Sequence, residues 1–216
     1  MIAAMRYTTA RCALSQFWAP PWILGLLALL VVTAPGAHAI DSLAVDSVVL
    51  LVVATWITVA TLGSEPAAQR AAIAAQLGGQ IRYRMASVAA SALAAFALTP
   101  FALVWSAVQR GDMTLPIAVF GVLGAVTACV TGATVGALVA RPLVDRVGFT
   151  LLFALVLDLA FIAIPGAPPV RSTLELSQST PELGAIVVFA ALQAVAAIVV
   201  GGLLCWAFAA LARRRS

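Results

Sequence analysis

The sequence contains no lysine and only one histidine, and charged residues make up 9% of its 216 residues. Soluble domains carry about 25% charged residues, so this chain lacks the polar surface that a water-soluble globule needs. All twelve basic residues are arginines, and the net charge is +4. Because 63% of the chain is hydrophobic, no face is left on which the arginines could form a nucleic-acid-binding patch. The composition excludes a soluble enzyme and predicts a protein whose partner is the lipid bilayer.

Cysteine and histidine are too scarce for several kinds of chemistry. The three cysteines share no CxxC spacing, so neither a metal site nor a disulfide framework is indicated. With His38 alone, the chain cannot supply the ligands of a metalloprotease or make a catalytic Ser–His pair inside the membrane. Without lysine it has no GxxxxGK[ST] motif for ATP. We therefore expect no catalytic site, metal or cofactor in this chain.

Long uncharged segments are what the sequence does contain. A hydrocarbon core about 30 Å thick requires roughly 20 apolar residues in a helix, and the runs show no strand-like alternation. We predict an all-α integral membrane protein, with residues 1–216 forming a single transmembrane domain of six spans. The expected spans are 17–34, 44–63, 85–107, 115–140, 147–165 and 183–211.

The arginines predict the orientation of these spans, because basic residues are retained on the cytoplasmic side. Ten of the twelve arginines lie before the first span, after the last, or in the loops that follow the second and fourth spans. Asp41, Asp46 and Asp112 lie in the arginine-poor loops. We expect a multi-pass protein of the plasma (inner) membrane with both termini in the cytoplasm.

The first span has an alternative interpretation. Basic residues, an apolar run and Ala37-His38-Ala39 are also typical of a secretory signal peptide and its cleavage site. Cleavage of residues 1–39 would leave five spans without inverting any of them.

The loop after the second span is predicted to contain a helix over residues 65–78. Ser64-Glu65-Pro66 is a helix start, and Gly78-Gly79 is a stop. At 100° per residue one sector is all alanine and can lie close against another backbone; it contains Ala67, Ala68, Ala71, Ala74 and Ala75. The opposite sector, which we expect to contact a partner, contains Gln69, Arg70, Ile73, Gln76 and Leu77. An interfacial helix lying on the membrane is the alternative.

The loop after the fourth span is short and charged. Arg141 and Asp145 are either a second contact for the same partner or only an anchor for the topology.

Asp158 is the carboxylate that we place deep within a span. Charge at that depth costs several kcal/mol, which makes Asp158 a functional candidate. The alternative is a hydrogen-bonded Asp that pairs with a neighbouring helix, for instance near Gln193 or Thr127.

Small residues and one proline mark two other spans. Gly132 and Gly136 have the GxxxG spacing that lets helix backbones approach closely, either inside the subunit or at a dimer seam. Pro100 is expected to kink the third span.

Together these features resemble the membrane subunit (permease) of an ABC transporter of the ABC-2 (type V exporter) class. The shared features are six spans, a helix in the first cytoplasmic loop, a short charged second loop and a small helical cap between the last two spans. The run Ser64-Glu65-Pro66-Ala67-Ala68-Gln69-Arg70 is similar to the corresponding loop of small actinobacterial members.

The resemblance implies that two such subunits, identical or not, export a hydrophobic or amphipathic cargo, with ATP and Mg bound by a separate ATP-binding subunit. It assigns docking of that subunit to Glu65, Gln69, Arg70, Ile73, Gln76 and Leu77, with Arg141 and Asp145 as a second contact. Two alternatives stay open: a non-transporting membrane scaffold or assembly protein, and a proton-coupled carrier that uses Asp158.

Overall fold

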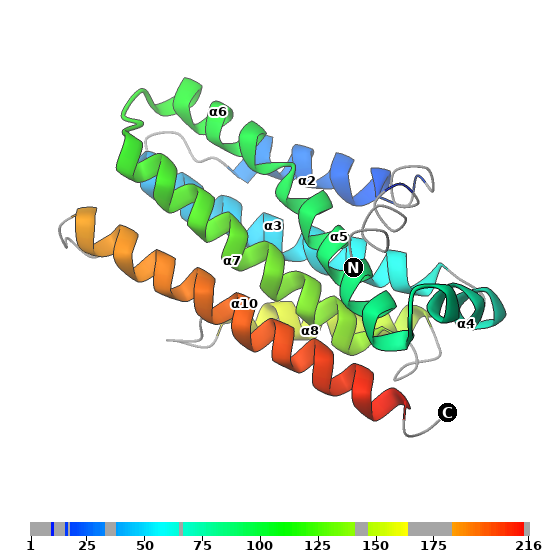
Figure 1. Ribbon diagram of the computed structural model, residues 1–216. Helices are drawn as coiled ribbons and strands as arrows, with labels where there is room; N and C mark the ends of the chain where they lie inside the picture. Colours follow the sequence, from blue (N-terminus) through cyan, green and yellow to red (C-terminus); the bar gives the residue numbers. More distant parts are fainter. Residues whose placement is uncertain are drawn as a thin grey trace.

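The computed structural model describes residues 10, 16, 18–32, 38–64, 67–140, 147–163 and 183–213. All regular structure in this part of the chain is helical, which confirms the predicted fold class there, and the long helices lie side by side in an elongated bundle (Figure 1). The helices are α2 (Ala19–Val32), α3 (Ala39–Gly63), α4 (Ala67–Gln76), α5 (Gln80–Phe96), α6 (Thr99–Arg110), α7 (Leu115–Val139), α8 (Val147–Ala163) and α10 (Leu183–Arg213).

Four helical segments are long and apolar enough to cross a membrane. They are Ala39–Gly63, Gln80–Arg110, Leu115–Val139 and Gly184–Ala210. The apolar helices Ala19–Val32 and Leu152–Ala163 are shorter than the roughly 20 residues that a span requires. The structure therefore supports a multi-pass membrane protein, and the six-span topology stays a prediction.

Helix α3 begins before the predicted span 44–63, at Ala39. Both carboxylate oxygens of Asp112 lie 3.3 Å from the backbone nitrogen of Ala39, which donates to them, and Asp41 lies in the first turn. Negative charge at a helix N-terminus stabilises the helix. The prediction that Asp46 lies in an outer loop is wrong, because this residue lies within α3 and is only 2% exposed.

The predicted third span is interrupted near Pro100. Helix α5 ends at Phe96, and α6 begins at Thr99 with the proline in its first turn. Proline has no N–H for the helical ladder and crowds the preceding turn, so the chain turns through Ala97 and Leu98 before α6 continues. The predicted kink is confirmed.

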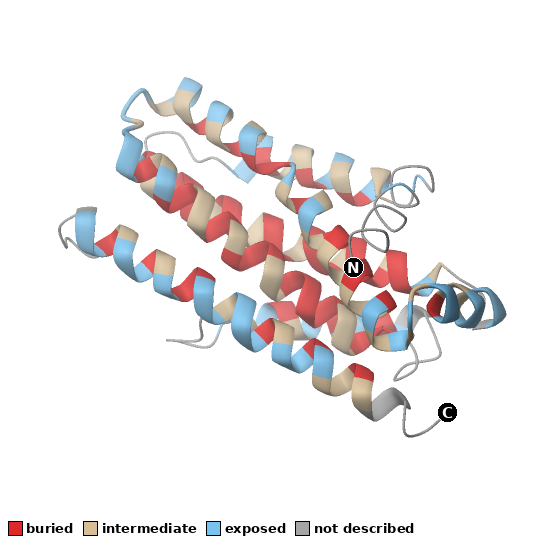
Figure 2. Ribbon diagram, in the orientation of Figure 1, coloured by how far each residue is buried: buried red, intermediate tan, exposed pale blue. Residues whose placement is uncertain are grey.

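Helix α3 is the central element of the bundle. It packs most extensively against α7 and also contacts α2, α5, α6 and α8. Its Leu50, Leu51 and Ala54 form the main core with Ala125 and Ala128 of α7. Figure 2 shows buried residues concentrated along α3 and α7, whereas α10 alternates between buried and exposed positions.

Large apolar side chains on the outside of the bundle are exposed on α2, α8 and α10, among them Leu27, Phe153 and Leu203. An apolar surface of this extent causes association in water. It is the surface that a hydrocarbon environment requires.

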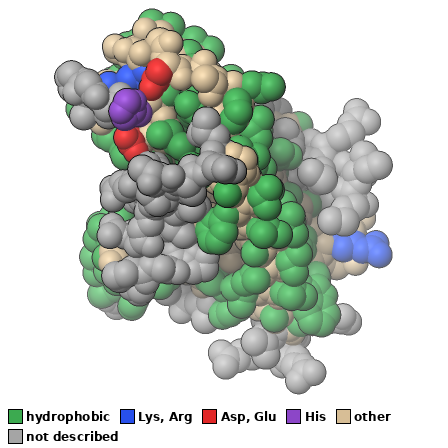
Figure 3. All heavy atoms as spheres, turned by 90° about the vertical axis from the view of Figure 1, so that its left-hand side faces the viewer, with side chains coloured by type: hydrophobic (Ala, Val, Ile, Leu, Met, Phe, Trp, Pro, Cys, Tyr) green, Lys and Arg blue, Asp and Glu red, His purple; other side chains and the backbone are tan. Residues whose placement is uncertain are grey.

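Apart from the buried Asp46 and Asp158, the charged side chains of the described residues lie at the two ends of the bundle. One end, named here the arginine end, is formed by α4, the start of α5 and the ends of α3, α7 and α10 (Figure 1), and carries Arg70, Arg82 and Arg84. The opposite end carries His38, Asp41, Arg110 and Asp112. Figure 3 faces this opposite end and shows acidic, basic and histidine side chains gathered at one edge, with apolar side chains beside them.

Candidate functional site

The helix predicted between the second and third spans is present as α4 and is separate from the long apolar helices. Helix α4 lies at the arginine end and packs on α5. It ends where predicted: Gly78 and Gly79 have φ values of 84° and 123°, which glycine adopts without strain. The backbone N–H of Gly79 donates to the carbonyl of Ala74 at 2.7 Å, which closes the helix in the manner of a glycine C-cap.

The packed face of α4 differs from the prediction. Ala74 is buried and Arg70, Ile73 and Leu77 are half-buried, whereas three alanines of the supposed packing face are exposed, namely Ala68, Ala71 and Ala75. The expectation that the alanine face packs is therefore wrong for these positions. Ile73 and Leu77 present more apolar area than alanine does, so turning them toward the bundle releases more free energy.

Three exposed residues form what we name the outward stripe of α4: Gln69, Ala72 and Gln76. Their spacing of three and four residues places them on one side of the helix. Of the predicted docking residues, Gln69 and Gln76 belong to the outward stripe. Glu65, Arg141 and Asp145 lie outside the described residues, as does the predicted outer cap.

A second polar site joins three helices inside the bundle. The Thr55 hydroxyl of α3 lies 3.0 Å from Oδ1 of Asp158 on α8, 3.0 Å from the carbonyl of Leu51 and 3.1 Å from the carbonyl of Gly132 on α7. Asp158 and Thr55 are each 2% exposed.

This arrangement has a hydrogen-bond pattern for either protonation state of Asp158. An ionised Asp158 accepts a hydrogen bond from the Thr55 hydroxyl. A protonated Asp158 donates to Thr55, whose own proton then goes to one of the two carbonyls, because a hydroxyl both donates and accepts.

Asp158 does not use the partners that the sequence suggested. Its hydrogen-bond partner is Thr55, whereas Thr127 donates to the Leu123 carbonyl of its own helix at 2.8 Å. Gln193 is buried on α10, and α10 packs against α7 and α5. The sequence shows hydroxyls on several helices but not which of them faces α8.

The glycines of α7 explain how Thr55 reaches this helix. A Cβ atom on Gly132 would overlap the carbonyl oxygen of Leu51, and one on Gly136 would lie 2.7 Å from the carbonyl oxygen of Thr55. Both glycines therefore face α3 inside the subunit, and their missing side chains bring the two backbones together.

Sequence reasoning missed that polar side chains of both α3 and α6 are buried in the bundle, namely Ser42 and Asp46 of α3 and Ser106 of α6. Neither carboxyl oxygen of Asp46 has a hydrogen-bond partner among the described residues, and the same holds for the hydroxyls of Ser42 and Ser106. Arg110 interacts electrostatically with Asp46. The signal lay in the spacing: Ser42 and Asp46 are four residues apart, and so are Ser106 and Arg110, within otherwise apolar segments.

Within the described ranges, no three or more His, Cys, Asp or Glu side chains come close enough to hold a metal ion. Comparison with protein-family models, with curated proteins and with solved structures finds no match to this chain.

Proposed function

We propose that this chain is the transmembrane subunit of an ATP-driven exporter of the ABC-2 class, and that a separate ATP-binding subunit docks on α4. The observation that carries the proposal is the placement of α4. It is a separate helix at the arginine end, fixed to α5 on one side and exposing the outward stripe on the other. In this proposal ATP and Mg bind to the partner subunit, and this chain forms the translocation path for the cargo.

The connections of α4 support a role in transmitting movement. Only residues 64–66 separate it from α3, the central helix of the bundle. On its other side α5 begins at Gln80, directly after the glycine stop Gly78-Gly79. A displacement of α4 therefore acts at once on α3 and on α5, and through α3 on α7 and α8.

The distribution of charge supports docking of the partner at the arginine end. The described arginines other than Arg110 lie at the arginine end together with α4. Basic residues are retained in the cytoplasm, where ATP is available. The apolar character of the spans favours a hydrophobic or amphipathic cargo, and two membrane subunits complete the path.

A substitution in the outward stripe tests the docking. Ala72→Arg places a long charged side chain at an exposed position, so it blocks a partner without disturbing the packed face. We expect it to lower the amount of ATP-binding subunit that co-purifies with the protein by at least tenfold. The matched control is Gln109→Arg, at an exposed position at the opposite end, which should retain the partner.

Full retention of the ATP-binding subunit by Ala72→Arg would show that the docking assignment is wrong. If the protein that binds to the outward stripe has no Walker-A motif, the result would instead indicate a membrane scaffold.

A proton-coupled carrier is the second candidate function, and one observation favours it. Two carboxyl groups, those of Asp46 and Asp158, are buried within the described helices, where the sequence had suggested one. Proton flux can be measured with a pH-sensitive dye in vesicles that contain the purified protein. A carrier should show proton flux in the wild type, and Asp158→Asn should abolish it. Unchanged flux in that variant would eliminate the carrier.

A further inference from the structure

The junction between α5 and α6 departs from the hydrogen-bond pattern of a continuous helix. In an α-helix the backbone N–H of Leu98 would donate to the carbonyl of Ala94, but here it donates to the carbonyl of Ala95 at 3.0 Å. Pro100 has no N–H to offer to the carbonyl of Phe96. The junction therefore leaves the Ala94 carbonyl open to a donor from outside the helix.

Trp22 of α2 is this donor. Its indole Nε1 lies 2.9 Å from the carbonyl oxygen of Ala94. A backbone carbonyl without a donor is costly inside a membrane, and proline is tolerated in a span because neighbouring groups pair with the carbonyls that it frees. The contact with Trp22 thus stabilises the change of direction between α5 and α6 (Figure 1).

Helix α2 is held against this junction from one side. A Cβ atom on Gly25 would lie 2.7 Å from Cγ2 of Val53 and 3.3 Å from Cδ1 of Leu98, so α2 approaches both α3 and the junction closely. Large side chains on α2 are exposed, namely Ile23, Leu24 and Leu27. A movement of α2 away from the junction therefore leaves the core between α3 and α7 in place.

The same backbone groups have a second way to pair. If Trp22 moves away, the N–H of Leu98 can donate to the Ala94 carbonyl as in an α-helix, so this carbonyl keeps a donor. The bond from Leu98 to Ala95 is of the 3₁₀ type, and a 3₁₀ turn in the middle of a helix often marks a hinge. An exchange of the Ala95 carbonyl for that of Ala94 changes the angle between α5 and α6.

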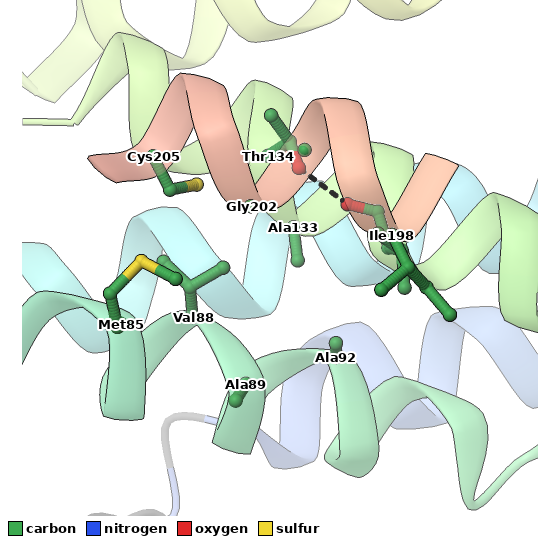
Figure 4. A pocket seen from close by; sticks show the side chains of 11 residues that line it. Met85, Val88, Ala89, Ala92, Ala133, Thr134, Ile198, Gly202 and Cys205 are labelled. Carbon is green, nitrogen blue, oxygen red and sulfur yellow. Dashed lines mark hydrogen bonds between the residues drawn. The ribbon is translucent and has the colours of Figure 1, made fainter. Parts of the chain in front are cut away.

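Helix α5 has room to change its angle on the side that faces α10. A cavity of about 150 Å³ lies between α5, α7 and α10, and Met85, Ala89 and Ala92 of α5 line it (Figure 4). A Cβ atom on Gly202 of α10, which also lines the cavity, would meet nothing within 4 Å. Because α5 packs against α3 and α7 on its other sides, a turn about the junction moves the start of α5 toward α10.

We propose that the junction between α5 and α6 is a hinge and that Trp22 is its latch. While the indole is bound to the Ala94 carbonyl, the hinge keeps the bent form seen here. Release of the indole lets α5 turn into the cavity beside α10. The latch belongs to this chain alone and does not depend on the proposed docking of an ATP-binding subunit.

The distance between two spin labels tests the latch. The labels are attached to Arg82→Cys on α5 and Val199→Cys on α10, both at exposed positions, in a chain whose native cysteines are replaced. A change of about 20° at the hinge moves the start of α5 by roughly 8 Å. Trp22→Phe keeps an aromatic ring but removes the N–H donor, so it should shorten the mean distance by about 5 Å or more.

The matched control is Trp206→Phe, the same substitution at a position that is 56% exposed, which should leave the distance unchanged. A distance in Trp22→Phe that is unchanged or longer, or an equal change in both variants, would overturn the proposal.

Pro100→Ala tests the hinge while Trp22 stays in place. Alanine restores an N–H for the carbonyl of Phe96 and favours a continuous helix. This variant should shorten the same distance, and adding Trp22→Phe to it should change the distance no further. Shifts that simply add would show that the proline and the tryptophan act separately, which would contradict the latch.

A last pair of variants tests the direction of the movement. Gly202→Leu fills the cavity, and Gly184→Leu adds the same side chain to α10 at another position where a Cβ atom meets nothing within 4 Å. Combined with Trp22→Phe, Gly202→Leu should restore the wild-type distance, whereas Gly184→Leu should leave it shortened. A shortened distance in both combinations would show that α5 does not turn into the cavity.

Discussion

Helices α3 and α10 are both long and apolar, but they have opposite surroundings. In the most apolar 18-residue window of each helix, 67% of the window is buried in α3 and 22% in α10. Helix α3 contains serines, threonines and two aspartates, whereas the polar side chains of α10 are Gln193 and the terminal Arg213. Hydrophobicity identifies both as candidate spans, and the small polar residues distinguish the central helix from the peripheral one.

The reason lies in the small size of these side chains, whose hydroxyls find their acceptors within α3 itself. Thr58 donates to the Ala54 carbonyl at 2.8 Å and Ser47 to the Ala44 carbonyl at 2.6 Å, both within α3. Small side chains of this kind occupy little space and let neighbouring helices approach. Helix α10 instead presents large aliphatic side chains outward, as a lipid-facing helix does.

The largest expected effect comes from breaking the packing of α3. Gly132→Leu places a side chain against the backbone of α3, where no flexible group can move aside. We expect it to lower the free energy of unfolding by about 3 kcal/mol, measured by denaturant titration in detergent.

Gly184→Leu on α10 is the control for this prediction, because its position is open. It should change the free energy of unfolding by less than about 0.5 kcal/mol. Equal effects of the two substitutions would remove the distinction between the central and the peripheral helix.

An intermediate effect is expected from two threonines of α3. Thr55→Val removes the hydrogen-bond partner of Asp158 and should cost about 1–3 kcal/mol of folding free energy. Thr58→Val removes a hydroxyl that bonds to its own helix, so it should cost less than about 1 kcal/mol. The same titration measures both, and a larger loss for Thr58→Val would show that the contact with Asp158 is unimportant for stability.

The smallest effect is expected at the N-terminus of α3. The backbone N–H of Ala39, and secondarily the side chain of His38, lower the pKa of the Asp112 carboxyl from its ordinary value of 3.8. The carboxylate form therefore stabilises the fold at neutral pH, and this contribution is lost as the pH falls through the lowered pKa.

Asp112→Asn should accordingly lower the melting temperature slightly at pH 7, and its difference from the wild type should shrink as the pH falls below 3.8 and through the lowered pKa of Asp112. Thermal unfolding at a series of pH values measures this. A difference that stays constant down to that pH would show that the carboxylate does not stabilise α3.

Much of the fold could be predicted from local signals. Gly78-Gly79 ends α4, Pro100 interrupts the third span, and the prediction of 115–140 agrees with α7 at Leu115–Val139. Each of these signals acts within a few residues of where it stands, so one sequence is enough to interpret it.

The remaining features depend on contacts between distant segments. Asp112 extends α3 to Ala39 across a separation of 73 residues, and Thr55 meets Asp158 across 103. The packed face of α4 is likewise decided by α5 and not by the helix itself. Periodicity describes the faces of a helix, but it does not show which neighbour each face meets.

We propose that α4 displays its outward stripe in the cytoplasm for an ATP-binding partner. A single cysteine at position 72, in a chain whose native cysteines are replaced, tests it with a membrane-impermeant maleimide. We expect labelling in inverted vesicles, no labelling in intact cells, and protection from labelling when the partner is bound. Labelling of Ala72→Cys from outside intact cells would contradict it.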